Sequence, residues 1–178
     1  MITRLAGAFA VAALVASALV GCSTPTDPAE PTPLFTSEAQ AFAAAEETYR
    51  AYVDALNQVD LSDPATFEPV FALTTGEANA EFRATFSQMH ADEWVVAGDS
   101  RASLVEPVEW SNAERLITLA ICLDVSQVTL TDADGISMVS ADRPDTQSML
   151  VSLVTVPSSA TGFAITTFES RQGSPECD

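Results

Sequence analysis

Residues 116–130 read LITLAICLDVSQVTL, and this stretch decides the fold class. Apolar side chains occupy every second position from Ile117 to Val125, which is the period of a β-strand with one buried face. The alternation changes phase at Val128, which predicts a β-bulge near Ser126. A long strand in the second half of the chain is therefore the first element that the sequence predicts.

More strand-like segments surround this stretch. Residues 132–135, Asp-Ala-Asp-Gly, have the composition of a hairpin turn. The other segments with a strand-like apolar pattern are 94–97, 102–110, 136–140, 147–156 and 163–169. Together they predict about four long antiparallel strands in the C-terminal half of the chain.

The first half of the chain has a helical period instead. Apolar side chains from Ala41 to Leu56 recur at three- and four-residue steps, which predicts one amphipathic helix. Ser37 and Gln40 fit the capping-box pattern at its start.

Two shorter helices are predicted after it. Asp63 and Pro64 favour a helix start, and this helix reaches residue 72 with a limit set by Pro69. Thr74 and Glu77 offer a second capping box for a helix that ends near residue 91.

Helices followed by strands predict an α+β domain, with the N-terminal helices packed on a curved antiparallel sheet of about four strands. Over residues 35–170 this layout resembles the NTF2-like, or cystatin-cone, fold. The resemblance implies a cavity between the helices and the sheet. Residues 122–125, 132–135 and 142–144 are also similar to small actinobacterial lipoproteins.

The first 21 residues have the organisation of a secretory signal peptide. A basic start ending at Arg4 precedes an apolar run over 5–20 that is short for a membrane span. Residues 19–22, Leu-Val-Gly-Cys, resemble the lipobox of bacterial lipoproteins. The resemblance implies that a lipid on Cys22 anchors the mature protein to the extracytoplasmic face of the cell membrane. The alternatives are an ordinary secreted protein and a retained N-terminal helix.

Residues 22–35 are rich in Pro and Thr and favour an extended tether, so the domain is expected over 36–178. The formal net charge of −18, with 25 acidic and seven basic residues, disfavours nucleic-acid binding, which depends on basic side chains. The expected partners are the membrane, reached through the lipid on Cys22, and either an envelope protein or a small apolar ligand.

The chain contains three cysteines. With Cys22 lipidated, Cys122 and Cys177 form an even pair outside the cytosol, which predicts a disulfide. The alternative is two free thiols, with Cys122 buried in a strand.

Catalytic groups are few, and we expect neither a cofactor nor a metal site. His90 is the single histidine, and its place near a helix end also suits a partner of the helix dipole. Asp124 is the second candidate base, if its strand face lines the cone. Trp94 and Trp110 line a ligand cavity or belong to the core.

The composition therefore favours a membrane-anchored extracytoplasmic binding module. An isomerase- or cyclase-like enzyme that uses the cone cavity is the alternative, and a structural spacer is a third reading. The Asp-Ala-Asp-Gly stretch is expected to be a plain turn, since a calcium-binding EF-hand loop needs more oxygen ligands.

Overall fold

The computed structural model describes residues 34–177. The predicted signal peptide, Cys22 and most of the predicted tether lie outside this range. The helical elements are α1 (Glu38–Leu56), the 3₁₀ turn η1 (Pro64–Phe67), α2 (Glu68–Ala72) and α3 (Gly76–Ala91). The strands are β1 (Val95–Ala97), β2 (Arg101–Ser111), β3 (Leu116–Asp124), β4 (Thr129–Thr131), β5 (Thr146–Thr155) and β6 (Phe163–Ser170).

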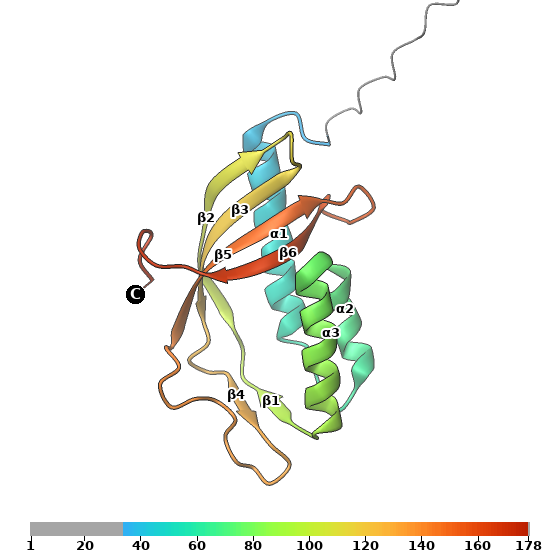
Figure 1. Cartoon of the computed structure of the whole chain (residues 1–178), viewed down its shortest axis with the longest axis vertical. Helices are drawn as coiled ribbons and strands as arrows, with labels where there is room; N and C mark the ends of the chain where they lie inside the picture. Colours follow the sequence, from blue (N-terminus) through green and yellow to red (C-terminus); the bar gives the residue numbers. More distant parts are fainter. Residues whose placement is uncertain (1–33, 178) are drawn as a thin grey trace, which may run out of the picture. The chain divides into compact units, whose positions relative to one another are not determined.

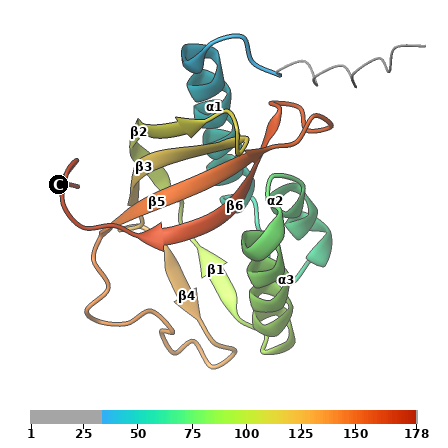
Figure 2. The same cartoon turned by 45° about the horizontal axis from the view of Figure 1, so that its top comes forward.

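The four long strands form one antiparallel sheet with the order β2-β3-β5-β6. Helix α1 lies against one face of this sheet and contacts β2, β3 and β6, while α3 packs beside β6 (Figures 1 and 2). The predicted α+β class is confirmed, as is the predicted order of helices followed by an antiparallel sheet.

The long helix begins much as the sequence predicts. The Ser37 hydroxyl accepts a hydrogen bond from the Gln40 backbone N–H at 3.3 Å. The side chain of Gln40 does not return to Ser37 but accepts from the backbone N–H of Thr36 at 3.2 Å. Half of the predicted capping box is therefore present, and the other half lies one residue earlier.

The second predicted capping box is wrong. Thr75, and not Thr74, precedes α3, and its side chain makes no capping hydrogen bond. The Thr74 hydroxyl donates to the Val70 carbonyl at 3.0 Å, and the Thr75 N–H donates to the Ile165 carbonyl at 2.7 Å. Thr74 forms a bridge with Ile165 of β6 one residue before the N-cap position, and its hydroxyl is already bonded to Val70, so it cannot cap α3.

The predicted bulge near Ser126 is also wrong, because the chain leaves the sheet there. The backbone N–H of Val125 donates to Asp145, and that of Val128 donates back to Val125. The chain then pairs with β1 through β4 in a separate two-stranded sheet (Figure 1). Segment 136–140 returns through a single bridge, Thr131 to Ser137, and not as a full strand.

Aromatic side chains pack in the space between the helices and the four-stranded sheet. Tyr52 lies 5.7 Å from Phe82 and 5.3 Å from Phe168, measured between ring centroids. Phe86 continues this cluster toward Phe67, at 5.1 Å. Burial of one such side chain contributes roughly 2 kcal/mol. Trp94 and Trp110 are half-buried and pack against the same core.

Candidate functional site

A pocket of about 370 Å³ lies where the ends of α1 and α3 face the two-stranded sheet. Apolar side chains dominate its wall. The main ones are Leu56 and Leu61, Phe86 and Met89 of α3, Val96 of β1 and Leu130 of β4. The pocket thus lies beside the aromatic cluster, on the side of the small sheet.

One amide positions the two sides of the pocket. Asn57, the C-cap of α1, donates from Nδ2 to the Ser100 carbonyl at 2.9 Å and accepts from the Ser100 N–H at 2.8 Å. This pair joins the end of α1 to the connection between β1 and β2. Gly98 on that connection has a φ of +83°, and a Cβ there would collide with the Gln127 carbonyl oxygen.

Arg143 is the charged residue in the pocket wall formed by the described part of the chain. Its Nη2 donates to the carbonyls of Val125 and Val128, at 2.8 and 3.0 Å. The guanidinium therefore holds the turn that separates β3 from β4. Ser140, also in the wall, donates its hydroxyl to the Asp142 carboxylate.

Large apolar side chains are exposed at the pocket and beside it. Val95, Ile136 and Met138 are 57%, 62% and 42% exposed. Val95 belongs to β1, and the other two follow the hairpin turn after β4. Ile136 and Met138 return on the face of β4 that carries the wall residue Leu130, whereas strand alternation places Val95 on the opposite face from Val96.

Carboxylates stand directly beside the pocket residues in the sequence. Asp60 lies between Val59 and Leu61, Asp99 between Gly98 and Ser100, and Asp142 between Ser140 and Arg143. These three aspartates are exposed.

Two of these carboxylates have a lowered pKa. Hydrogen bonds from the side chain and backbone of Ser62 hold the pKa of Asp60 below its ordinary value. The bond from the Ser140 hydroxyl does the same to the pKa of Asp142. These carboxylates are therefore ionised at neutral pH.

His90 lies outside the pocket wall, although its neighbour Met89 is part of it. Its Nδ1 is 2.7 Å from the Leu61 carbonyl oxygen and therefore donates to it, since a carbonyl can only accept. The imidazole edge also meets the Phe67 ring, with 6.5 Å between centroids. These contacts tie the end of α3 to the segment after α1.

Asp124 also lies outside the pocket wall. It ends β3 opposite Arg101, and the alternation of the strand places it on the same face as Cys122, away from the helices. Its carboxylate accepts from the Ser126 N–H at 2.9 Å, and hydrogen bonds from Ser126 lower its pKa. The structure therefore does not bring the two candidate bases together in a cavity.

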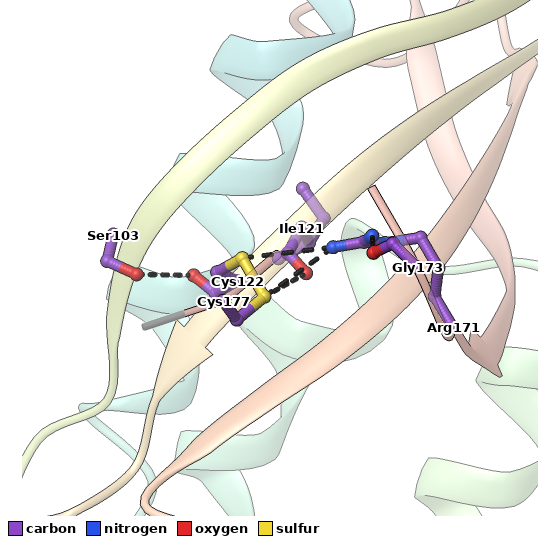
Figure 3. The surroundings of a disulfide bond; sticks show 6 residues. All are labelled: Ser103, Ile121, Cys122, Arg171, Gly173 and Cys177. Carbon is purple, nitrogen blue, oxygen red and sulfur yellow. Dashed lines mark hydrogen bonds between the residues drawn. A yellow bond between two sulfur atoms is a disulfide. The ribbon is translucent and has the colours of Figure 1, made fainter. Parts of the chain in front are cut away.

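The predicted bond between Cys122 and Cys177 is present, with 5.5 Å between the Cα atoms. It fastens the C-terminal tail to the face of β3 opposite the helices (Figure 3). Arg171 lies beside it, with Nη2 3.5 Å from the Cys177 sulfur and Nη1 donating to the Gly173 carbonyl at 2.6 Å.

The Asp-Ala-Asp-Gly turn is held by its first residue. Oδ1 of Asp132 accepts from the N–H groups of Asp134 and Ile136, at 3.0 and 2.8 Å. Within residues 34–177, no group of three or more His, Cys, Asp or Glu side chains is arranged to hold a metal ion. Among the helices of the same range, none has the length and apolar character needed to cross a membrane.

Sequence reasoning missed the pocket because it missed the two-stranded sheet. Val96 pairs with Leu130, 34 residues later, and no local pattern records so distant a pairing. The phase change at Val128 was the available signal, since it marks the point where β4 separates from β3.

No protein-family model and no curated protein matches the chain. Among solved structures, it is similar to CagV, a VirB8 homolog of T4SS from Helicobacter pylori strain 26695. That likeness has a TM-score of 0.47 and 10% identity, and covers 73% of this chain and 99% of the other. It is also similar to a periplasmic fragment of TraM (TM-score 0.39, 14% identity, coverage 78% and 100%). The third is the Agrobacterium tumefaciens VirB8 protein (TM-score 0.42, 10% identity, coverage 76% and 94%).

Proposed function

We propose that this protein is a lipid-anchored extracytoplasmic binding module that holds apolar groups in the pocket between α1, α3 and the β1–β4 sheet. In this proposal residues 1–21 are a signal peptide, Cys22 carries the lipid, and 22–35 tether the domain formed by 36–178. The observation that carries it is the apolar wall of a pocket of about 370 Å³.

The size and lining of the pocket support binding. Small-molecule sites typically enclose about 300 to 1,000 Å³ and have mainly apolar walls with a few placed polar groups. Here the amide of Asn57 and the guanidinium of Arg143 already bond to backbone groups, at 2.8 to 3.0 Å. The remaining wall offers apolar area, and its transfer out of water contributes about 25 cal/mol per Å².

The isomerase or cyclase alternative needs an acid or a base on the cavity wall. Among the described residues, the wall contains no Asp, Glu or His side chain. The placement of Asp124 and His90 outside the wall gives that alternative no support.

A neutral fluorescent probe, N-phenyl-1-naphthylamine, tests the binding proposal. We expect saturable fluorescence enhancement with the wild-type domain. Binding to Val96→Phe should be at least about tenfold weaker, because the larger side chain occupies part of the pocket. Val108→Phe is the matched control, because Val108 lies outside the pocket and is 54% exposed. Equal binding by both variants would remove the pocket as the site.

A second blocking variant guards against a misfolded Val96→Phe. Met138 is 42% exposed and lines the pocket. In Met138→Lys the ammonium group can therefore stay in solvent while it places a positive charge at the edge of the apolar wall. We expect the same loss of probe binding, with an unchanged far-UV circular dichroism spectrum.

The anchor needs a separate test. The Cys122–Cys177 disulfide supports an oxidising compartment, where such bonds persist. We expect Cys22→Ala to abolish palmitate labelling and to release the protein from the membrane fraction. Unchanged labelling and fractionation would refute the lipid anchor and leave the pocket proposal standing.

A further inference from the structure

Building on the proposed function, we infer that the pocket receives a segment of a partner protein whose apolar side chains are flanked by Lys or Arg. The pocket wall, the exposed apolar side chains of Ile136 and Met138 and the carboxylates beside the wall together define this occupant. We call these three aspartates, Asp60, Asp99 and Asp142, the rim carboxylates.

The exposed apolar side chains favour a polypeptide over a small molecule. Ile136 and Met138 are 62% and 42% exposed, and they return beside β4 on the face of the wall residue Leu130. Met138 lines the pocket but Ile136 does not, so a small ligand enclosed within 370 Å³ would leave Ile136 in water. A polypeptide segment that places side chains in the pocket and continues past Met138 would bury Ile136 as well.

The negative charge beside the pocket favours basic residues on either side of the apolar part of that segment. The rim carboxylates are exposed; Asp60 and Asp99 each lie between two wall residues in the sequence, and Asp142 directly precedes the wall residue Arg143. The cation of the wall, Arg143, directs Nη2 to the Val125 and Val128 carbonyls. A basic flank would therefore meet three carboxylates.

The same charges disfavour other occupants. With a formal net charge of −18, the chain repels an acidic lipid surface and an anionic amphiphile. A second copy of this chain, bound through the same surface, would bring its rim carboxylates close to those of the first copy. The described domain shows one ion pair, Arg50 with Glu46 on α1, so most of its acidic side chains lack a basic partner within that range.

Three peptides with one apolar core and different flanks provide the probe. Each carries the sequence Leu-Phe-Leu-Leu-Phe between paired Lys, Ser or Glu residues and the same uncharged fluorophore. In 20 mM NaCl we expect the Lys-flanked peptide to bind about tenfold tighter than the Ser-flanked one, and the Glu-flanked peptide to bind most weakly. In 300 mM NaCl this difference should shrink to about threefold or less, because the ions screen the rim.

Charge-neutral variants locate the effect. Asp60→Asn, Asp99→Asn and Asp142→Asn, combined, keep the acceptor oxygens that Ser62 and Ser140 use but remove three charges. This triple variant should lose most of the preference for Lys flanks. The matched control changes three exposed carboxylates at another surface, Glu77→Gln, Glu81→Gln and Glu169→Gln, and should retain it.

The outcomes separate this inference from the proposed function. Equal affinities for all three flanks, or equal losses in both triple variants, would overturn the basic partner while leaving an apolar site. Probe binding without any peptide binding would point to a small ligand and overturn it too. A wild-type dimer broken by Met138→Lys would assign the surface to a second copy. Failure of the neutral probe to bind would instead refute the pocket proposal itself.

Discussion

Asn57 shows how one residue fixes the geometry of the pocket. Its side chain ends α1 and also completes two hydrogen bonds with the backbone of Ser100, 43 residues away. Ser100 is buried, so these backbone groups would lack a partner if the amide were removed. Such a loss costs more than the bond itself contributes, because the groups remain out of water.

We expect Asn57→Ala to lower the free energy of unfolding by about 2 kcal/mol in urea titrations. Asn112→Ala is the matched control, because Asn112 is exposed and accepts a hydrogen bond from the Arg115 N–H through its backbone carbonyl, which the substitution keeps. A loss of similar size in both variants would mean that the Asn57 amide does not join α1 to β2.

At the scale of elements, the connection between β1 and β2 lies directly against the connection between β3 and β4. Gly98 and Gly135 have similar dihedral angles, with φ of +83° and +79°. A Cβ on Gly98 would meet the Gln127 carbonyl, whereas nothing lies within 4 Å of a Cβ on Gly135. Comparing alanine variants of the two glycines therefore separates the cost of backbone strain from the cost of a steric collision.

We expect Gly98→Ala to reduce the stability of the domain by about 2 kcal/mol more than Gly135→Ala, measured by urea unfolding. Both variants carry the cost of a positive φ, and Gly98→Ala adds the displacement of the β3–β4 connection. Equal losses of stability in the two variants would show that the β3–β4 connection moves away from the added Cβ without a measurable cost in free energy.

The disulfide is a second element-scale constraint. It links residues 55 positions apart and joins the tail to β3. In the chain-entropy account, closing a loop of this length stabilises the folded state by about 4 kcal/mol. Cys122→Ala with Cys177→Ala should lower the urea midpoint accordingly, and a midpoint that did not move would show that the tail adds no constraint.

The elements divide into those that local patterns specify and those that they do not. The stripe on α1 and the alternation in β3 are local; the bounds of α1 were predicted closely, whereas the strand predicted over 116–130 ends at Asp124 and the chain pairs again only in β4. The pairing of β1 with β4 is not local, and it depends on the turn held by Arg143 through Val125 and Val128. The candidate pocket depends on this pairing, so the sequence predicted an apolar binding module without its site.

At the scale of the whole molecule, charge is the dominant feature. The formal net charge is −18, and the isoelectric point is about 4.1. Mutual repulsion among carboxylates opposes folding at neutral pH and weakens when salt screens it. As the pH falls toward 4, protonation relieves the same repulsion.

We expect 500 mM NaCl to raise the thermal midpoint by roughly 3 °C or more at pH 7.5 and by much less at pH 4.5. Calorimetry at 20 and 500 mM NaCl measures both shifts. Salt effects of equal size at the two pH values would contradict a stability limited by self-repulsion.

Acidification to still lower pH should instead lower the stability of the domain. Hydrogen bonds lower the pKa values of Asp60, Asp124 and Asp142 below the ordinary 3.8. Their contribution to stability is therefore present above the unfolded-state pKa and is lost as the pH falls through the folded-state values. Stability should decline below about pH 3.5, and the individual Asn variants should flatten that decline.

The position of a bound apolar probe tests the central claim most directly. Methyl NMR of the domain during titration with N-phenyl-1-naphthylamine should shift the signals of Val96, Leu130 and Met138, which line the pocket. Leu104 and Leu150, paired with Cys122 and Ala120 on the sheet face opposite the helices, should stay unchanged. Shifts confined to Leu104 and Leu150, or no shifts at all, would contradict the pocket as the binding site.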